Sequence, residues 1–289
     1  MAEVRRRNRN KASVNFELWS IAVSCAALFI LTISALLPAI FTVVLSGIFA
    51  AILAIGLPEL LDNPDKHHAN ISLGIIGILT IVLLISDTGF LTISLCLAFG
   101  LLICFMNEIA RLNSRKDLIY SLATNVISMI CVVGAISWII FTELYSWHFF
   151  VLPLTISVAL SNGFISLLKL NKGFLSLKHH SLIVSIIALT ISFAVSWITV
   201  KIAYKVGYQL YVTSAVLLDS SNIFTLNCSI PLVYSAIIAI VSLGYAFVKK
   251  AIVEFELKPQ GIFSLIAVNL VPITIMSLPT YILLRVIGG

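Results

Sequence analysis

The sequence predicts an all-α membrane protein, a bundle of about nine membrane-spanning helices with its N-terminus inside and its C-terminus outside. The 289 residues are 60% hydrophobic and 10% charged, whereas a soluble domain has about 25% charged residues. The mean hydropathy is +1.12. Apolar runs of about 18 or more residues recur along the whole chain, which is typical of transmembrane helices and not of β-barrel strands.

Polar breaks divide the predicted membrane domain, residues 18–285, into nine candidate spans. The spans are 18–37, 39–58, 71–86, 89–106, 118–141, 149–170, 181–200, 228–248 and 261–285. Pro38 separates the first two, because proline ends or kinks a helix. A basic tail, 1–17, precedes the first span, which is too long for a signal-peptide core and is predicted to be retained.

The basic residues predict the orientation of these spans. With the N-terminus inside, the inner segments hold 15 of the 18 Lys and Arg residues and the outer segments hold Lys201, Lys205 and Arg285. This split agrees with the positive-inside rule for nine spans that run from an inner N-terminus to an outer C-terminus. The tryptophans, such as Trp138 and Trp197, lie at or near predicted span ends, which supports the list of spans.

The longest predicted aqueous segment is 201–227, on the outer side. Tyr204, Tyr208 and Tyr211 lie at i, i+4 and i+7, so they share one helical face. Two interpretations stay open. The segment is either an interfacial helix on the outer leaflet or a lid over a pathway.

The chain lacks the sequence motifs of several known classes of membrane enzyme. The sequence has no HExxH, no GxSG and no phosphate-binding glycine loop, and a cofactor is not predicted. The five cysteines form no CxxC pair. Two pairs of adjacent histidines lie in predicted loops, and we expect them to be solvated and not to bind a metal ion. The net charge of +6 is explained by membrane orientation, so a nucleic-acid partner is not predicted. The sequence thus predicts no catalytic residue and does not favour an enzyme.

Amide side chains are the deepest polar groups in the predicted spans. Asn125 lies in the fifth span, Asn162 with Gly163 in the sixth and Asn269 in the ninth. These residues are candidates for a substrate path, because Gly163 opens the helix backbone next to an amide. The alternative is that the amides hydrogen-bond neighbouring helices and only hold the bundle together.

A charged island, NEIARLNSRKD at 107–117, separates the fourth and fifth spans. Glu108, Arg111 and Arg115 lie at i, i+3 and i+7 and are predicted to share a helical face that extends the fourth span into the cytoplasm. With Lys116, the arginines are suited to the anionic headgroups of the inner leaflet. The island is therefore predicted to be an anchoring connector, with a cytoplasmic partner or anionic ligand as the alternative.

The same island resembles a family of uncharacterised actinobacterial multi-pass membrane proteins, sometimes called permeases. The family's connector reads H-E-x-x-R-R-D-G-R-x-x-L-x-E-S before a Thr-containing apolar stretch. The residues that fit this pattern are Glu108, Arg111, Arg115, Leu118, Ser121, Ala123 and Thr124. Those that depart from it are Asn107, Leu112, Asn113, Ser114 and Tyr120. The resemblance implies a bacterial inner (plasma) membrane but no specific activity.

Three functions are consistent with these features. The first is a permease-like transporter or channel for a small solute. The second is a non-catalytic scaffold or assembly factor for the cell envelope, which would bind a membrane-protein partner. The third is a lipid- or isoprenoid-handling enzyme.

Overall fold

The computed structural model describes residues 19, 22–86, 90–110, 118–143, 151, 154–158, 180–205, 235–242, 244–245 and 261–288. All regular structure in this part of the chain is helical. Five of its helices are long and apolar enough to cross a membrane. The prediction of an all-α fold made of apolar helices is confirmed for the described residues. Asn162, Gly163, Arg111, Arg115 and Lys116 lie outside them.

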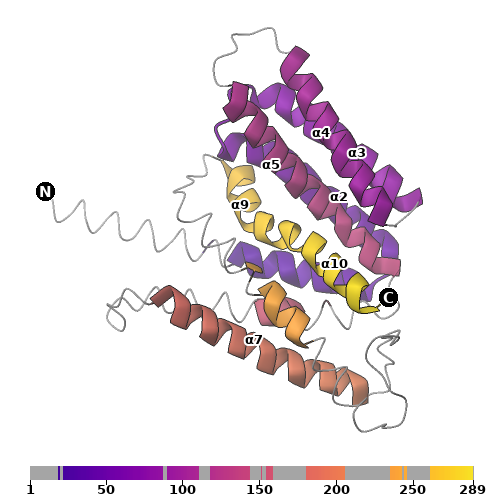
Figure 1. Cartoon of the computed structure of the whole chain (residues 1–289), viewed down its shortest axis with the longest axis vertical. Coiled ribbons are helices and arrows are strands. Elements are labelled where there is room, and N and C mark those ends of the chain that lie inside the picture. Colours follow the sequence, from indigo (N-terminus) through magenta and orange to yellow (C-terminus); the bar gives the residue numbers. More distant parts are fainter. Residues whose placement is uncertain are drawn as a thin grey trace, which may run out of the picture.

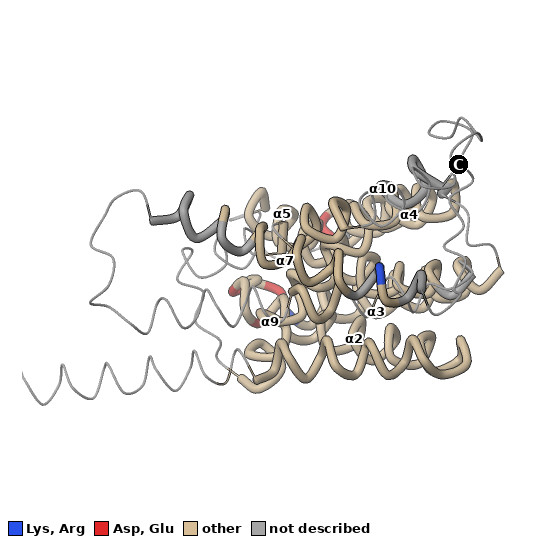
Figure 2. The backbone as a smooth tube through the Cα atoms, turned by 90° about the horizontal axis from the view of Figure 1, so that it is seen from below, with Lys and Arg blue, Asp and Glu red and all other residues tan. Residues whose placement is uncertain are grey.

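The main elements follow the chain in order. They are α2 (Ala39–Leu60), α3 (Lys66–Ser86), α4 (Phe90–Ala110), α5 (Leu118–Ile136), η1 (Ser137–Glu143), α7 (His180–Lys205), α9 (Ile262–Ile275) and α10 (Ser277–Gly288). A shorter apolar helix, Ala22–Leu36, precedes α2. Figure 2 shows how few charged residues these helices contain.

Several helix boundaries differ from the predicted spans, and two of these differences have a local reason. Helix α3 begins at Lys66, because the carboxylate of Asp65 accepts a hydrogen bond from the backbone N–H of His68 and caps the first turn. Helix α4 continues to Ala110, four residues beyond the predicted end. The last predicted span is divided at Met276 into α9 and α10, where Pro279 cannot donate a backbone hydrogen bond to the preceding turn.

Helix α5 lies at the centre of the bundle. It contacts α2, α3, α4 and α9, while α2 also packs along α9. Figure 1 shows α2, α3, α4 and α5 grouped together, with α7 lying apart from α3 and α4. The position of α5 explains why most of its C-terminal half is buried.

Two glycines allow the central helices to approach closely. A Cβ at Gly56 of α2 would collide with the carbonyl oxygen of Phe263 and with Ala267 of α9. A Cβ at Gly134 of α5 would collide with the carbonyl oxygen of Thr274. Small residues of this kind bring helix backbones together where apolar side chains gain little from leaving lipid.

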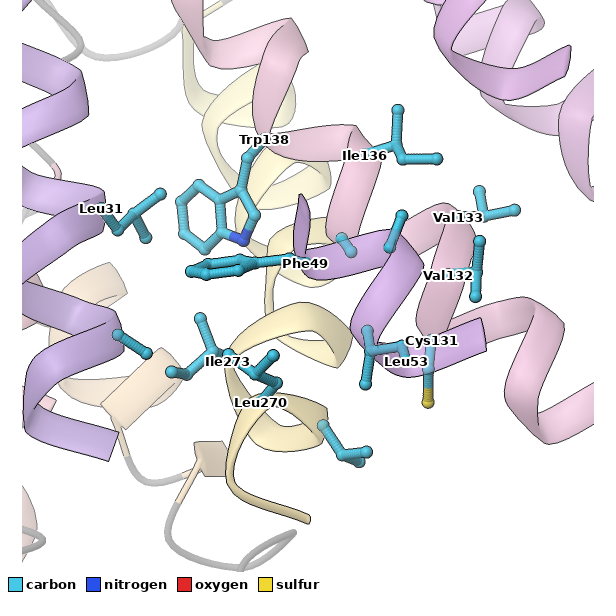
Figure 3. Close-up of a cluster of buried hydrophobic side chains, with 14 of the residues drawn as sticks. Leu31, Phe49, Leu53, Cys131, Val132, Val133, Ile136, Trp138, Leu270 and Ile273 are labelled. Atoms are coloured by element: carbon cyan, nitrogen blue, oxygen red, sulfur yellow. The ribbon is translucent and has the colours of Figure 1, made fainter. Parts of the chain in front are cut away.

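The apolar core lies between the first helix, α2, α5, η1 and α9. Figure 3 shows the Trp138 side chain of η1 directly above the ring of Phe49 of α2, with Leu31 of the first helix to its left. Trp138 is 2% exposed. The sequence placed this tryptophan at a span end, where it would face the membrane interface. Its position near the end of α5 agrees with that prediction, but the side chain packs inside the bundle instead.

Candidate functional site

Glu108 is the buried acidic residue at the end of α4. Its side chain is only 7% exposed. The buried face of α4 repeats every four residues through Cys96, Gly100, Cys104 and Glu108, which is the spacing of one helical stripe. The carboxylate therefore continues the face that packs on the bundle. Glu108 was predicted to belong to the cytoplasmic connector. That role stays a prediction, and the structure adds that α5 covers the Glu108 side chain.

Two side chains of α5 hold the Glu108 carboxylate. Asn125 Nδ2 donates to Oε1 over 2.9 Å, and the Ser121 hydroxyl donates to the same oxygen. Ser121 and Asn125 are four residues apart, so they lie on one face of α5. Hydrogen bonds of this charge-assisted kind are about twice as strong as those between neutral groups.

The turn between α2 and α3 brings a second amide to the same place. Asp62 adopts a positive φ of 47°, and the backbone N–H groups of Asp62 and Asn63 donate to the carbonyls of Glu59 and Pro58. These two bonds form a Schellman ending for α2. The ending turns the chain so that the Asn63 side chain, 2% exposed, lies among residues of α5.

Asn63 joins this turn to α5 through its amide. Its Nδ2 donates to Asn125 Oδ1 over 2.8 Å and to Thr124 Oγ1 over 3.0 Å. Its Oδ1 accepts from the backbone N–H of Asp65 over 3.0 Å. We call Asn63, Glu108, Ser121, Thr124 and Asn125 the Glu108 cluster. It combines one carboxylate, two amides and two hydroxyls, all buried.

The predicted path residues do not form one group in the described part of the chain. Asn125 belongs to the Glu108 cluster, whereas Asn269 accepts a hydrogen bond from Ser24 over 3.2 Å and donates to the carbonyl of Leu265. The structure thus divides these two amides between separate hydrogen-bond networks.

Asn63, Ser121 and Thr124 were missed as site residues. Asn63 lies in a predicted loop, and nothing in its local sequence indicates that its side chain is buried. For Ser121 and Glu108 a signal was present. Glu108 follows Cys104, Gly100 and Cys96 at four-residue spacing, and Ser121 precedes Asn125 by the same interval. A polar residue that continues a stripe of small residues is expected to face a neighbouring helix.

A second carboxylate lies near the cluster's end of the bundle, at the start of α9. The Glu59 carboxylate occupies the space that a Gly261 Cβ would need, and Gly261 is the N-cap of α9. A negative charge is favourable there because helix N-termini carry a partial positive charge. The Glu59 side chain therefore lies against the start of α9.

We next consider whether the described residues could bind a metal ion. No group of three or more His, Cys, Asp or Glu side chains that could hold a metal ion occurs among them. His68 instead pairs with Asp65 over 2.8 Å at the exposed start of α3. The Glu108 cluster is suited to hydrogen bonding or to binding a positive group.

No protein-family model, curated protein or solved structure matches this chain. Any functional conclusion therefore depends on the geometry of the Glu108 cluster and on the apolar helices that surround it.

Proposed function

We propose that this chain is a nine-span transporter of a small polar solute in a bacterial plasma membrane, with its N-terminus inside and its C-terminus outside. The Glu108 cluster would form the cytoplasmic part of its solute pathway. The basic connector with Arg111, Arg115 and Lys116 would contact anionic headgroups on the same side. The resemblance to the actinobacterial family, carried by 107–121, is part of this proposal.

The polar contacts between helices support the proposed topology. Each of the following bonds joins residues that the nine-span arrangement places toward the same side of the membrane. Toward the inner side they are Glu108–Asn125, Asn63–Asn125 and Ser24–Asn269, and toward the outer side Thr32–Thr155 and Ser157–Ser196. An odd error in the number of spans between two partners would place them on opposite sides.

The single observation that carries the proposal is the buried carboxylate of Glu108. An ionisable side chain inside a membrane bundle is costly, and such residues usually mark solute or ion pathways. Ordinary packing between helices needs only neutral amides and hydroxyls, as in the Asn269 network. Among the described residues, Glu108 is the one buried carboxylate, and it lies where three elements meet.

The cluster also provides a way for solute binding to move helices. Glu108 on α4 is held by Ser121 and Asn125 on α5, and Asn63 holds the α2–α3 turn to α5. A solute that replaced one of these bonds would favour a different contact between α4 and α5. A change of this kind between two packed arrangements is what alternating access requires.

Transport by the purified protein tests this proposal. The full chain is reconstituted in liposomes and tested with radiolabelled amino acids, sugars and polyols beside protein-free liposomes. We expect uptake of at least one solute, and an initial rate at least tenfold lower for Glu108→Gln. Asp62→Asn is the matched control, because it removes an exposed carboxylate and asparagine tolerates positive φ.

Two results would contradict the proposal. One is an absence of uptake above the protein-free liposomes for every solute. The other is a wild-type rate for Glu108→Gln in protein that is folded and present at equal density.

A further inference from the structure

The α2–α3 turn, residues 61–65, has one side chain that is directed into the bundle. Asp62 and Pro64 are exposed, whereas Asn63 between them is 2% exposed. A buried amide must obtain its hydrogen bonds from the groups that cover it, and here α5 supplies an acceptor for each of the two N–H groups of Asn63. The turn therefore faces water with its outer residues and the Glu108 cluster with Asn63.

The Asn63 amide covers three polar residues of α5. Its nitrogen lies 2.8 Å from Asn125 Oδ1 and 3.0 Å from Thr124 Oγ1, and its oxygen lies 3.4 Å from Ser121 Oγ. Ser121 and Asn125 are also the residues that hold the Glu108 carboxylate. Asn63 therefore separates the exposed turn from the groups that a solute at Glu108 would contact.

Helix α5 holds the same turn with a side chain of its own. Tyr120, near the start of α5, donates its hydroxyl to the carbonyl oxygen of Leu61. Asn63 reaches from the turn to α5 and Tyr120 reaches from α5 to the turn, so the two side chains form a reciprocal clasp. Tyr120 is 50% exposed, and water can therefore replace its contact with the turn.

The clasp of Asn63 and Tyr120 differs from the deeper contacts of α2 and α5. Gly56 of α2 and Gly134 of α5 pack tightly against backbone carbonyls of α9. At the turn the contacts are hydrogen bonds between neutral groups, and exchanging such a bond for one to water has a small net cost. Asp62 also holds a positive φ of 47°, and residues held in this uncommon region cluster in segments that switch. The turn can thus leave α5 while the helices stay packed.

We propose that the α2–α3 turn is a cap that closes the Glu108 cluster from the cytoplasm, with Asn63 and Tyr120 as the clasp that holds it shut. The cap rests on the proposed function, because it would control when a solute reaches Glu108. Opening requires only that the two clasp residues exchange their partners for water. Local openings of this kind occur separately from global unfolding, so the cap can be measured without transport.

Thiol labelling beneath the cap measures its opening. Thr124 is 3% exposed and accepts a hydrogen bond from Asn63, so Thr124→Cys places a thiol of similar size under the turn. The full chain with this substitution is placed in lipid nanodiscs and treated with a water-soluble trimethylammonium methanethiosulfonate. Peptide mass spectrometry then gives the labelling rate of each cysteine. We expect slow labelling at position 124, because the reagent reaches it only while the turn is open.

Two variants in this background loosen the clasp. Asn63→Ala removes both α5 contacts of the amide and should raise the labelling rate at position 124 at least tenfold, whereas Tyr120→Phe removes one neutral hydrogen bond and should raise it about fivefold. Asp62→Asn is the matched control in the same turn. It changes an exposed side chain, and asparagine tolerates the positive φ, so the rate should stay unchanged.

Cys131 distinguishes opening of the cap from unfolding of the bundle. This native cysteine lies two turns further along α5 and is 0% exposed. Its labelling should stay slow in every variant, because a local opening at the turn does not expose it.

The proposal is overturned if Asn63→Ala and Tyr120→Phe both leave the rate at position 124 unchanged, or if Cys131 is accelerated by the same factor. Should Asn63→Ala fail to fold, Tyr120→Phe decides the outcome alone. Solute uptake with unchanged labelling would reject the cap alone. Accelerated labelling without uptake of any solute would reject the transport proposal alone.

Discussion

Asn125 Nδ2 donates to Glu108 Oε1 over 2.9 Å and connects the start of α5 with the end of α4. This contact joins a residue of the predicted substrate path to a residue of the predicted connector. Both were selected from the sequence for different reasons, and the structure places them in one buried cluster. The energetics of this pair therefore provide the most direct test of the site.

Asn125→Leu should lower the free energy of unfolding by about 1–2 kcal/mol, because a buried carboxylate loses a donor. The double variant Glu108→Met/Asn125→Leu should lose less than the sum of the two single variants, since each single change leaves the other partner of the pair buried and unsatisfied. Reversible unfolding in mixed detergent and SDS measures both values. Strictly additive losses would mean that the two side chains are not coupled.

Gly56→Ala should destabilise the bundle by about 1–3 kcal/mol, because an added methyl group would separate α2 from α9. Gly74→Ala is the matched control. Its Cβ would meet nothing within 4 Å, so the same change should be neutral or stabilise α3 by up to about 1 kcal/mol. The unfolding assay described above separates the two outcomes. Equal effects at both positions would contradict the close α2–α9 contact.

Glu59→Gln should reduce stability by about 0.3–1 kcal/mol at low ionic strength, because the carboxylate interacts favourably with the N-terminus of α9. Added salt should decrease the difference between the variant and the wild type, since Glu59 is half-buried and its interaction is screened. Thermal unfolding in 20 mM and 500 mM choline chloride measures this dependence. A difference that does not change with salt would point to packing and not to charge.

Reporter fusions test the proposed orientation. A fusion after Gly289 should be active on the outer face, and a fusion at Ser114 should be active on the cytoplasmic face. The physical reason is the concentration of Lys and Arg in the inner segments. A phosphatase reporter and a fluorescent-protein reporter give complementary signals on the two sides. The opposite pattern would require a different list of spans.

The helices were largely predictable because their signal is local. A run of about twenty apolar residues between polar breaks is sufficient to form a helix in lipid, where every backbone group must be satisfied within the segment. The predicted 39–58 and the observed Ala39–Leu60 illustrate this agreement. Helix ends were less accurate, because they depend on caps such as Asp65 and on chain turns such as the one at Asp62.

The candidate site was predictable only in part. Asn125 was selected because an amide inside an apolar span is unusual, and that argument needs no tertiary structure. Asn63 was missed because its burial results from the Schellman ending of α2 and from the position of α5 beside that turn. Glu108 was selected as part of the connector, but its burial was not predicted, since spacing shows which residues share a face and not what covers that face.

The sequence alone determined that this chain forms apolar helices, and it selected Glu108 and Asn125 as unusual residues. Only the tertiary structure decided that these two residues meet, that Asn63 joins them, and that Asn269 belongs to a different network. The physical reason is the range of the forces involved. Helix formation in an apolar environment depends on neighbouring residues, whereas the burial of a carboxylate depends on which helices pack around it.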